Sequence, residues 1–227
     1  MGETVEFPSN GHTCGGYLAT PPSGRGPGVV VIQEYWGVNA HVRDLCDRFA
    51  AEGFVALAPD LYHGKETKEP DEAGKLLMEL DLAEAARDML GAGRWLATSD
   101  RTAGDRVGIV GFSAGGRVTS GVAFHYLPEG RPAFVAPIYA GGGISKDVPV
   151  PADAPPMFVA AATDDSLGLA PESVNLYERW TDAHKSAELH LYAKGGHGFG
   201  MRQQHLPSDH WIDRFADWLE LQGWLKK

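Results

Sequence analysis

The sequence of 227 residues has no surplus of positive charge and no long apolar run. It carries 20 Lys and Arg against 30 Asp and Glu, for a net charge of −10, whereas nucleic-acid binding needs clustered basic side chains. No apolar stretch approaches the length of about 20 residues that crosses a bilayer. We therefore expect neither nucleic acid nor a membrane among the partners of this protein.

Cysteine is scarce, and the first residues lack the features of a signal peptide. Cys14 and Cys46 are the two cysteines of the chain, and their spacing is not typical of a metal site. The opening stretch MGETVEFPSNG has neither a basic segment nor an apolar core, as export would need. We expect two reduced thiols that act as small packing residues in a cytoplasmic protein.

Nine histidines are present, but none of them stands in a spacing typical of metal ligands. His205 and His210 lack such a pattern, and we interpret them as surface residues at the start of a helix. The GGG at residues 141–143 has neither the lysine nor the helix of a phosphate-binding loop. The sequence therefore predicts no metal and no cofactor.

Short apolar, β-branched runs alternate with longer helical patterns, which predicts a doubly wound, mostly parallel α/β sheet with right-handed crossovers. The expected strands are Thr4–Phe7, Gly16–Ala19, Val29–Ile32, Val55–Ala58, Val107–Val110, Val135–Tyr139, Met157–Ala161 and Glu188–Tyr192. The expected helices are His41–Glu52, Asp71–Ala97, Arg117–Tyr126, Pro171–His184 and Pro207–Gln222. The first two strands should form a hairpin at one edge, with Asn10 and Gly11 near its turn. No repeat or linker interrupts the pattern, so we expect one domain over residues 1–227, with about eight strands and no separate lid domain.

The stretch VGIVGFSAGGRV, residues 107–118, places a serine between glycines at the point where a strand ends and a helix begins. Glycines at such a turn weaken both elements. The glycines at this turn therefore need an explanation other than stability. One explanation is that the turn holds the hydroxyl of Ser113 where a substrate can reach it. A G-x-S-x-G segment between a strand and a helix is typical of the nucleophile elbow of hydrolases.

An acid pair and a histidine follow two later expected strands. Asp164 and Asp165 come after the seventh strand, and His197 comes after the eighth. Because the carboxyl ends of parallel strands meet at one edge of a sheet, these side chains should gather near Ser113. His197 can take the proton of the serine, and one carboxylate can hold the imidazole in the right tautomer. The residues alone leave the choice between Asp164 and Asp165 open, since either can also be a turn or cap residue.

The loop QEYWGVN after the third expected strand supplies further candidates. The backbone N–H groups of Tyr35, in this loop, and of Ala114, at the start of the helix after Ser113, are the expected donors to an oxyanion. Glu34 directly follows a buried strand, and burial should raise the pKa of its carboxyl. Its side chain either bonds to a neighbouring backbone group or Arg, or touches the nucleophile and modulates its proton.

At these residues the chain resembles the dienelactone hydrolase family of the α/β-hydrolase superfamily. The likeness is strongest over GYLATPP, VVVIQEYWGVN, DLCDRFAAEGFVALAPDLYHG and the elbow. The resemblance implies that Glu34 contacts the nucleophile and that Tyr35 and Ala114 donate to the oxyanion. It also favours Asp165 as the acid and His197 as the base.

Two features depart from that family. Typical dienelactone hydrolases have cysteine in the elbow, GFC, where this chain has Ser113. A hydroxyl is far less acidic than a thiol, so it depends on His197 rather than on a neighbouring carboxylate. From about Arg106 onward, VGIVGFSAGG, PPMFVAAATDDSLGLAPES and ELHLYAKGGHGFGM resemble acetyl- and feruloyl-type carbohydrate esterases. We therefore expect a hybrid, natural or engineered, of two hydrolase branches joined near residues 97–106.

The expected function is hydrolysis of a small-molecule ester or lactone, like that of a carboxymethylenebutenolidase, through an acyl-enzyme on Ser113. Substrates of the dienelactone type carry a carboxylate, so Arg202 and Arg87 are candidate partners for it, although arginines of this kind are more often surface charges. Trp36 is a further candidate for contact with the substrate. The alternatives are an idle hydrolase scaffold that binds a ligand or partner, and an acyltransferase. A monomer is feasible at this size, and an oligomer stays open.

Overall fold

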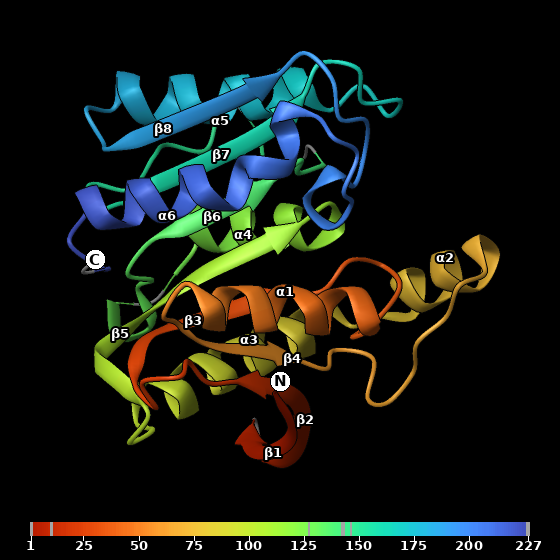
Figure 1. Ribbon diagram of the computed structural model, residues 1–227, viewed down its shortest axis with the longest axis vertical. Coiled ribbons are helices and arrows are strands. Elements are labelled where there is room, and N and C mark those ends of the chain that lie inside the picture. The colour runs from red at the N-terminus through yellow and green to blue at the C-terminus, as the bar shows by residue number, and fades with distance from the viewer. Residues whose placement is uncertain (1, 10, 127, 142–143, 146, 226–227) are drawn as a thin grey trace. The chain divides into compact units, whose positions relative to one another are not determined.

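Eight strands lie in the part of the chain that the structure describes, and each overlaps one of the strands expected from the sequence (Figure 1). This computed structural model describes residues 2–9, 11–126, 128–141, 144–145 and 147–225. The chain divides into two compact units, Met1–Gly108 and Ile109–Lys227. Strand β5 (Thr102–Phe112) begins in the first unit and ends in the second. The expectation of a single domain over residues 1–227 stays a prediction.

The sheet of the first unit has the strand order β1-β2-β4-β3. Its strands are β1 (Glu3–Ser9), β2 (His12–Ala19), β3 (Gly26–Ile32) and β4 (Val55–Pro59). As expected, β1 and β2 form an antiparallel hairpin at the sheet edge, while Asn10, expected near its turn, lies outside the described residues. β2 pairs with β4 in the antiparallel sense, and β3 pairs with β4 in the parallel sense.

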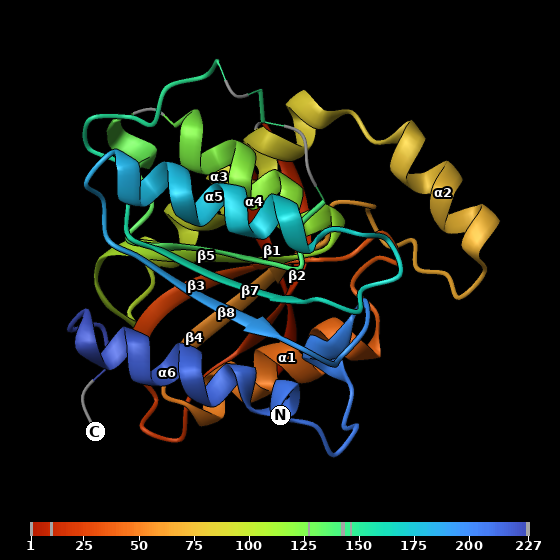
Figure 2. The same cartoon turned by 90° about the horizontal axis from the view of Figure 1, so that it is seen from above.

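Helices cover both faces of the first unit's sheet, with α1 on one side and α3 on the other (Figure 2). The helices of this unit are α1 (Ala40–Ala51), α2 (Pro70–Glu79) and α3 (Leu82–Ala97). The Asn39 side chain caps α1 by accepting from the N–H groups of His41 and Val42, as is typical at a helix start.

The expectation of one helix over Asp71–Ala97 is wrong, because the chain leaves the helix at Leu80, where ψ is 118°. Asp81 then starts α3. Its Oδ1 accepts from the N–H of Glu84 at 3.0 Å, and its carbonyl accepts from Ala85 at 2.9 Å. An aspartate that satisfies helix N–H groups in this way favours a new helix start over continuation.

In the second unit, β5 pairs with β6, β6 with β7 and β7 with β8, all in the parallel sense. The added strands are β6 (Val135–Ile138), β7 (Met157–Ala162) and β8 (Ala187–Tyr192), and the helices are α4 (Ala114–Phe124), α5 (Ala170–Asp182) and α6 (Trp211–Leu221). Figure 2 shows α4 and α5 on one face of these strands and α6 on the other. Every residue of β6 and β7 is buried, as continuous apolar runs predict. The mostly parallel α/β sheet is confirmed.

Aromatic side chains build the core of the second unit. Trp180 of α5 packs edge-on against Phe124 with ring centroids 5.0 Å apart, and its indole N–H donates to the carbonyl of Pro155 at 2.8 Å. The apolar stripe expected on the last helix is also buried, namely Trp211, Phe215, Trp218 and Leu219. Within the described ranges, no helix has both the length and the hydropathy to cross a bilayer, and no separate lid is evident among them.

Candidate active site

The turn between β5 and α4 holds Ser113 in an unusual backbone conformation. Its φ is 52° and its ψ is −113°, a region that costs an L residue energy and persists where the surroundings enforce it. The N–H of Ser113 donates to the carbonyl of Ile138 at 3.1 Å, which ties the turn to the end of β6. A serine at this position usually caps the helix with its hydroxyl, but the Ser113 side chain makes no capping bond. Its hydroxyl therefore serves another contact.

Gly111 allows the strand and the helix to approach closely at this turn. A Cβ built on Gly111 would lie 2.2 Å from the carbonyl oxygen of Gly115 and 2.3 Å from Oγ1 of Thr119. Real Cβ atoms do not approach other atoms so closely, so a side chain here would push α4 away from β5. The glycine that looked costly in the sequence is thus required by packing.

The hydroxyl of Ser113 begins a chain of two hydrogen bonds. Its Oγ lies 2.8 Å from Nε2 of His197, and Nδ1 of His197 lies 2.8 Å from Oδ2 of Asp165. The Asp165 side chain is 1% exposed and the His197 side chain is 22% exposed. Because an ionised carboxylate can only accept, Nδ1 of His197 carries its proton toward Asp165. Nε2 is then free to accept the proton of Ser113.

The turn after β7 fixes the carboxylate of Asp165. Its Oδ1 accepts from the N–H of Leu167 at 2.8 Å, and its carbonyl accepts from Gly168 at 2.9 Å. With one oxygen held by the backbone, the other faces His197 in a single orientation. The backbone of this turn therefore fixes the position of the carboxyl.

The side chain of Asp164, the other candidate acid, bonds to the loop that carries His197. Its Oδ1 accepts from the N–H of Gly196 at 2.8 Å, and its Oδ2 lies 3.8 Å from Nζ of Lys194. Asp164 therefore anchors the backbone of the loop that carries His197, while Asp165 contacts the imidazole itself. The structure brings Asp165, and not Asp164, to His197.

Tyr139 belongs to the surroundings of His197, although sequence reasoning missed it. Its buried ring meets the imidazole edge-on with centroids 5.3 Å apart, and it meets Phe199 in the same manner at 5.0 Å. Tyr139 directly follows β6, so its place at the carboxyl end of a parallel strand was the signal that could have found it. Its ring limits how far the imidazole can tilt.

Two more expected residues lie in the second unit. Ala114 is the first residue of α4, and the first four N–H groups of a helix have no partner within it. Arg202 is exposed, and a Cβ built on Gly198 would lie 3.5 Å from its Nη2. The Arg202 guanidinium is thus close to the residue after His197.

The remaining expected residues belong to the first unit. The rings of Tyr35 and Trp36 have centroids 4.3 Å apart. Burial and the charge of Glu34 raise the pKa of the Tyr35 phenol. Arg87 is exposed on α3. The roles expected for these four residues, and a raised pKa of Glu34, stay predictions.

The cysteines are packing residues, as expected. Cys14 and Cys46 are both free and buried. Burial, followed by the charges of Asp88 and Asp60, raises the pKa of the Cys14 thiol to about 12, and burial also raises the pKa of Cys46. Neither thiol is suited to be a nucleophile, because the reactive form is the thiolate.

The sequence did not predict a group of possible metal ligands that lies in the first unit. Among the described residues, His12, His63, Glu84 and Asp88 each offer one ligand atom, and these atoms lie within 4.8 Å of one another. The local signal was the i, i+4 spacing of the two acids on α3, which places both on one helix face.

Comparison with known proteins decides the family. The model of the dienelactone hydrolase family matches residues 14–227. The chain belongs to the dienelactone hydrolase family. An Escherichia coli (strain K12) relative named for carboxymethylenebutenolidase is 30% identical over 98% of this chain and 86% of its own length. "Protein usf" of Aquifex pyrophilus is 44% identical over 127 residues, and the chain spans about half the length of this relative and of an Aquifex aeolicus relative.

Solved structures support the same assignment. A Klebsiella pneumoniae protein named for dienelactone hydrolase is 26% identical, with a TM-score of 0.77 over 97% of this chain and 98% of its own. The dienelactone hydrolase-like promiscuous phosphotriesterase P91 is 18% identical with a TM-score of 0.78, over 97% of both chains, and shows likeness of fold. The family match and the fold therefore agree on the dienelactone hydrolase family. The family match spans the expected join at residues 97–106, so the comparisons give the hybrid no support.

Proposed function

We propose that this member of the dienelactone hydrolase family hydrolyses carboxylic esters or lactones of small molecules, with Ser113 as nucleophile, His197 as general base and Asp165 as the acid that orients it. The observation that carries the proposal is the hydrogen-bonded chain from Ser113 to Asp165. Both of its contacts are 2.8 Å long, within the reach that proton transfer needs. The nucleophile, base and orienting acid of acyl transfer have this mutual geometry.

In the first half of the reaction, Oγ of Ser113 attacks the carbonyl carbon while its proton passes to Nε2 of His197. The carbonyl oxygen becomes negative, and the N–H of Ala114 donates to it. Collapse of this intermediate breaks the bond to the leaving oxygen, which takes the proton from His197. The acyl group is now on Ser113, and the alcohol departs or, in a lactone, stays attached to the acyl chain.

In the second half, water replaces the alcohol. His197 takes a proton from the water as its oxygen attacks the acyl carbon, and then returns that proton to Oγ of Ser113. Asp165 stabilises the imidazolium in both halves without becoming protonated. The products are a carboxylic acid and the free enzyme.

We include in the substrate class esters that also carry a free carboxylate. The proximity of the Arg202 guanidinium to Gly198 supports this, because a guanidinium binds a carboxylate through two parallel hydrogen bonds. The contributions expected of Arg87, Trp36, Glu34 and the N–H of Tyr35 remain predictions alongside it.

The test combines a covalent probe with one inactivating variant. A fluorophosphonate should label the wild-type chain at Ser113, and p-nitrophenyl acetate should be hydrolysed. Ser113→Ala should lose labelling and fall to the background rate with an unchanged melting temperature. Ser166→Ala, which alters an exposed serine next to Asp165, is the matched control and should behave as wild type.

Each other outcome counts against the proposal. An unlabelled but folded wild-type chain would favour the idle scaffold. Product that forms only when an alcohol or thiol acceptor is added would favour an acyltransferase. Full turnover in Ser113→Ala would remove this serine from the mechanism.

A further inference from the structure

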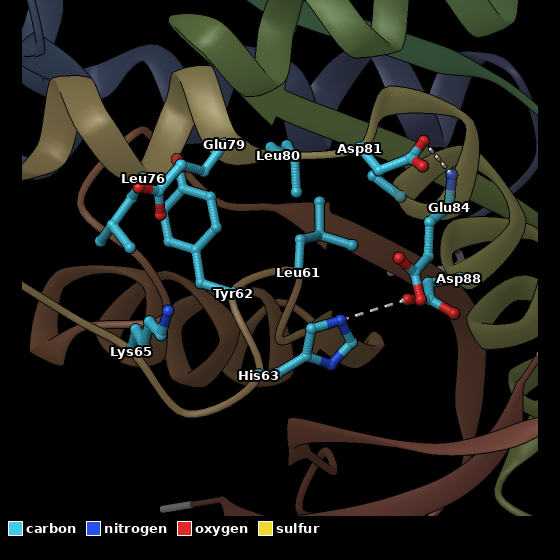
Figure 3. Close-up of a pocket in the computed structure, with 11 residues that line it drawn as sticks. Leu61, Tyr62, His63, Lys65, Leu76, Glu79, Leu80, Asp81, Glu84 and Asp88 are labelled. Carbon is cyan, nitrogen blue, oxygen red and sulfur yellow. Dashed lines mark hydrogen bonds and ion pairs between the residues drawn. The ribbon is translucent and has the colours of Figure 1, made fainter.

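Four side chains from three segments of the first unit lie close together, and three of them line a pocket. His12 comes from β2, His63 from the loop after β4, and Glu84 and Asp88 from successive turns of α3. Their potential ligand atoms all lie within 4.8 Å of one another. Figure 3 shows the imidazole of His63 directed at Asp88, with the carboxylate of Glu84 beside it.

The carboxylate of Asp88 is buried and only half satisfied. Its side chain is 1% exposed. Oδ1 accepts from Oγ of Ser9 at 2.8 Å and lies 3.2 Å from Nε2 of His12. Oδ2 of Asp88 and Nε2 of His12 are both buried without a hydrogen bond within the described part of the chain. Burying such atoms unsatisfied is costly, and a cation between them would satisfy both.

The adjoining pocket offers a route to this point. It has a volume of about 200 Å³, and its lining includes His63, Glu84 and Asp88. Four carboxylates and a single lysine are among the lining groups. The pocket therefore attracts positive charge, and Asp88 is part of its wall.

We propose that His12, His63, Glu84 and Asp88 bind one divalent transition-metal ion, and that Zn²⁺ fits them. Two imidazoles with two carboxylates are a donor set that suits Zn²⁺, whereas Ca²⁺ and Mg²⁺ prefer oxygen alone. Tetrahedral Zn²⁺ with bonds of about 2.0–2.1 Å sets its ligand atoms about 3.4 Å apart. Nε2 of His12 lies 3.2 Å from Oδ1 of Asp88, so the imidazole is at about that separation from this carboxylate.

The other ligands reach this geometry by small movements. Nε2 of His63 lies 3.9 Å from Oδ2 of Asp88, and the His63 side chain is 48% exposed, so its rotamer has room to adjust. The bound ion would link β2, the loop after β4 and α3. It would therefore stabilise the first unit, independently of ester hydrolysis.

This site replaces the expectation of no metal that the spacing of the histidines suggested. The two imidazoles are 51 positions apart, from His12 to His63, and they meet through the hairpin and the loop after β4. A motif search finds ligands that are close in sequence, and these are close only in space.

The test measures Zn²⁺ binding to the chain of 227 residues after treatment with a chelator. Titration calorimetry with ZnCl₂ should give one ion per wild-type chain, and Zn²⁺ should raise the melting temperature. His63→Asn and Glu84→Gln should each weaken binding at least about tenfold and abolish most of that rise. Asparagine suits position 63, where φ is 52°, because it tolerates this conformation.

Matched controls separate the site from general effects. His184→Asn changes another exposed histidine with positive φ, 56°, outside the cluster. Glu79→Gln removes a carboxylate that lines the same pocket without belonging to the cluster. Both should bind Zn²⁺ within twofold of wild type. A wild-type chain that binds no Zn²⁺, or an unchanged affinity in either site variant, overturns the proposal.

Discussion

Replacing Asp165 by Asn keeps the shape of the side chain but changes what faces His197. The N–H of Leu167 donates to Oδ1 at 2.8 Å, so the new amide will place its oxygen there. Its NH₂ group then takes the position of Oδ2, 2.8 Å from Nδ1 of His197. A donor at that point forces Nδ1 to accept, and the imidazole proton moves to Nε2. Nε2 can then no longer take the proton of Ser113.

The loss from this tautomer change should be large. A substitution of this kind lowers kcat by about 10⁴-fold, or about 5.5 kcal/mol of transition-state stabilisation. Asp164→Asn is the matched control, because its amide oxygen can still accept from Gly196. It gives up an exposed ion pair with Lys194 at 3.8 Å, which is worth about 1 kcal/mol or less. We expect it to keep at least about a fifth of wild-type activity.

The assay is the steady-state hydrolysis of p-nitrophenyl acetate by the two variants and wild type, with melting temperatures measured in parallel. Equal losses in both variants would show that the two acids are not distinguished as the structure implies. An Asp165→Asn variant within tenfold of wild type would refute the tautomer argument. A loss confined to Asp164→Asn would reverse the choice of acid.

Two further predictions concern packing. Gly111→Ala should destabilise the fold by about 1–3 kcal/mol, because its Cβ would lie 2.2 Å from the carbonyl oxygen of Gly115. Gly121→Ala is the control, since a Cβ there meets nothing within 4 Å. Thermal melting should show a lower melting temperature for Gly111→Ala and an unchanged one for Gly121→Ala. Cys14 and Cys46 should resist iodoacetamide at pH 8 in the native chain and react in urea, as mass spectrometry will show. With the pKa of Cys14 raised to about 12, only about one thiol in 10⁴ is ionised at that pH, so rapid native labelling would contradict the burial.

The central strands β6 and β7 were predictable from the sequence because their apolar runs are local and continuous. β6 and β7 are buried along their whole length, and that burial is what the runs of β-branched and apolar residues encode. The break between α2 and α3 was not predictable in the same way. The apolar pattern continues across Leu80 and Asp81, and only the capping contact of Asp81 with Glu84 shows where one helix ends.

The same distinction between local and long-range contacts holds for the candidate site. The strand, the glycines and the helix start around Ser113 are neighbours in the chain, so the sequence by itself predicted the turn at Ser113. It also predicted the contact of Ser113 with His197, its proposed base. The choice between Asp164 and Asp165 depended on a turn that directs one carboxylate to the imidazole and the other to a backbone N–H. The contact of Tyr139 with His197 and the meeting of His12, His63, Glu84 and Asp88 likewise belong to the tertiary structure. These side chains come from segments far apart in the chain. Their distances from one another depend on the folded structure, so no local sequence pattern predicts them.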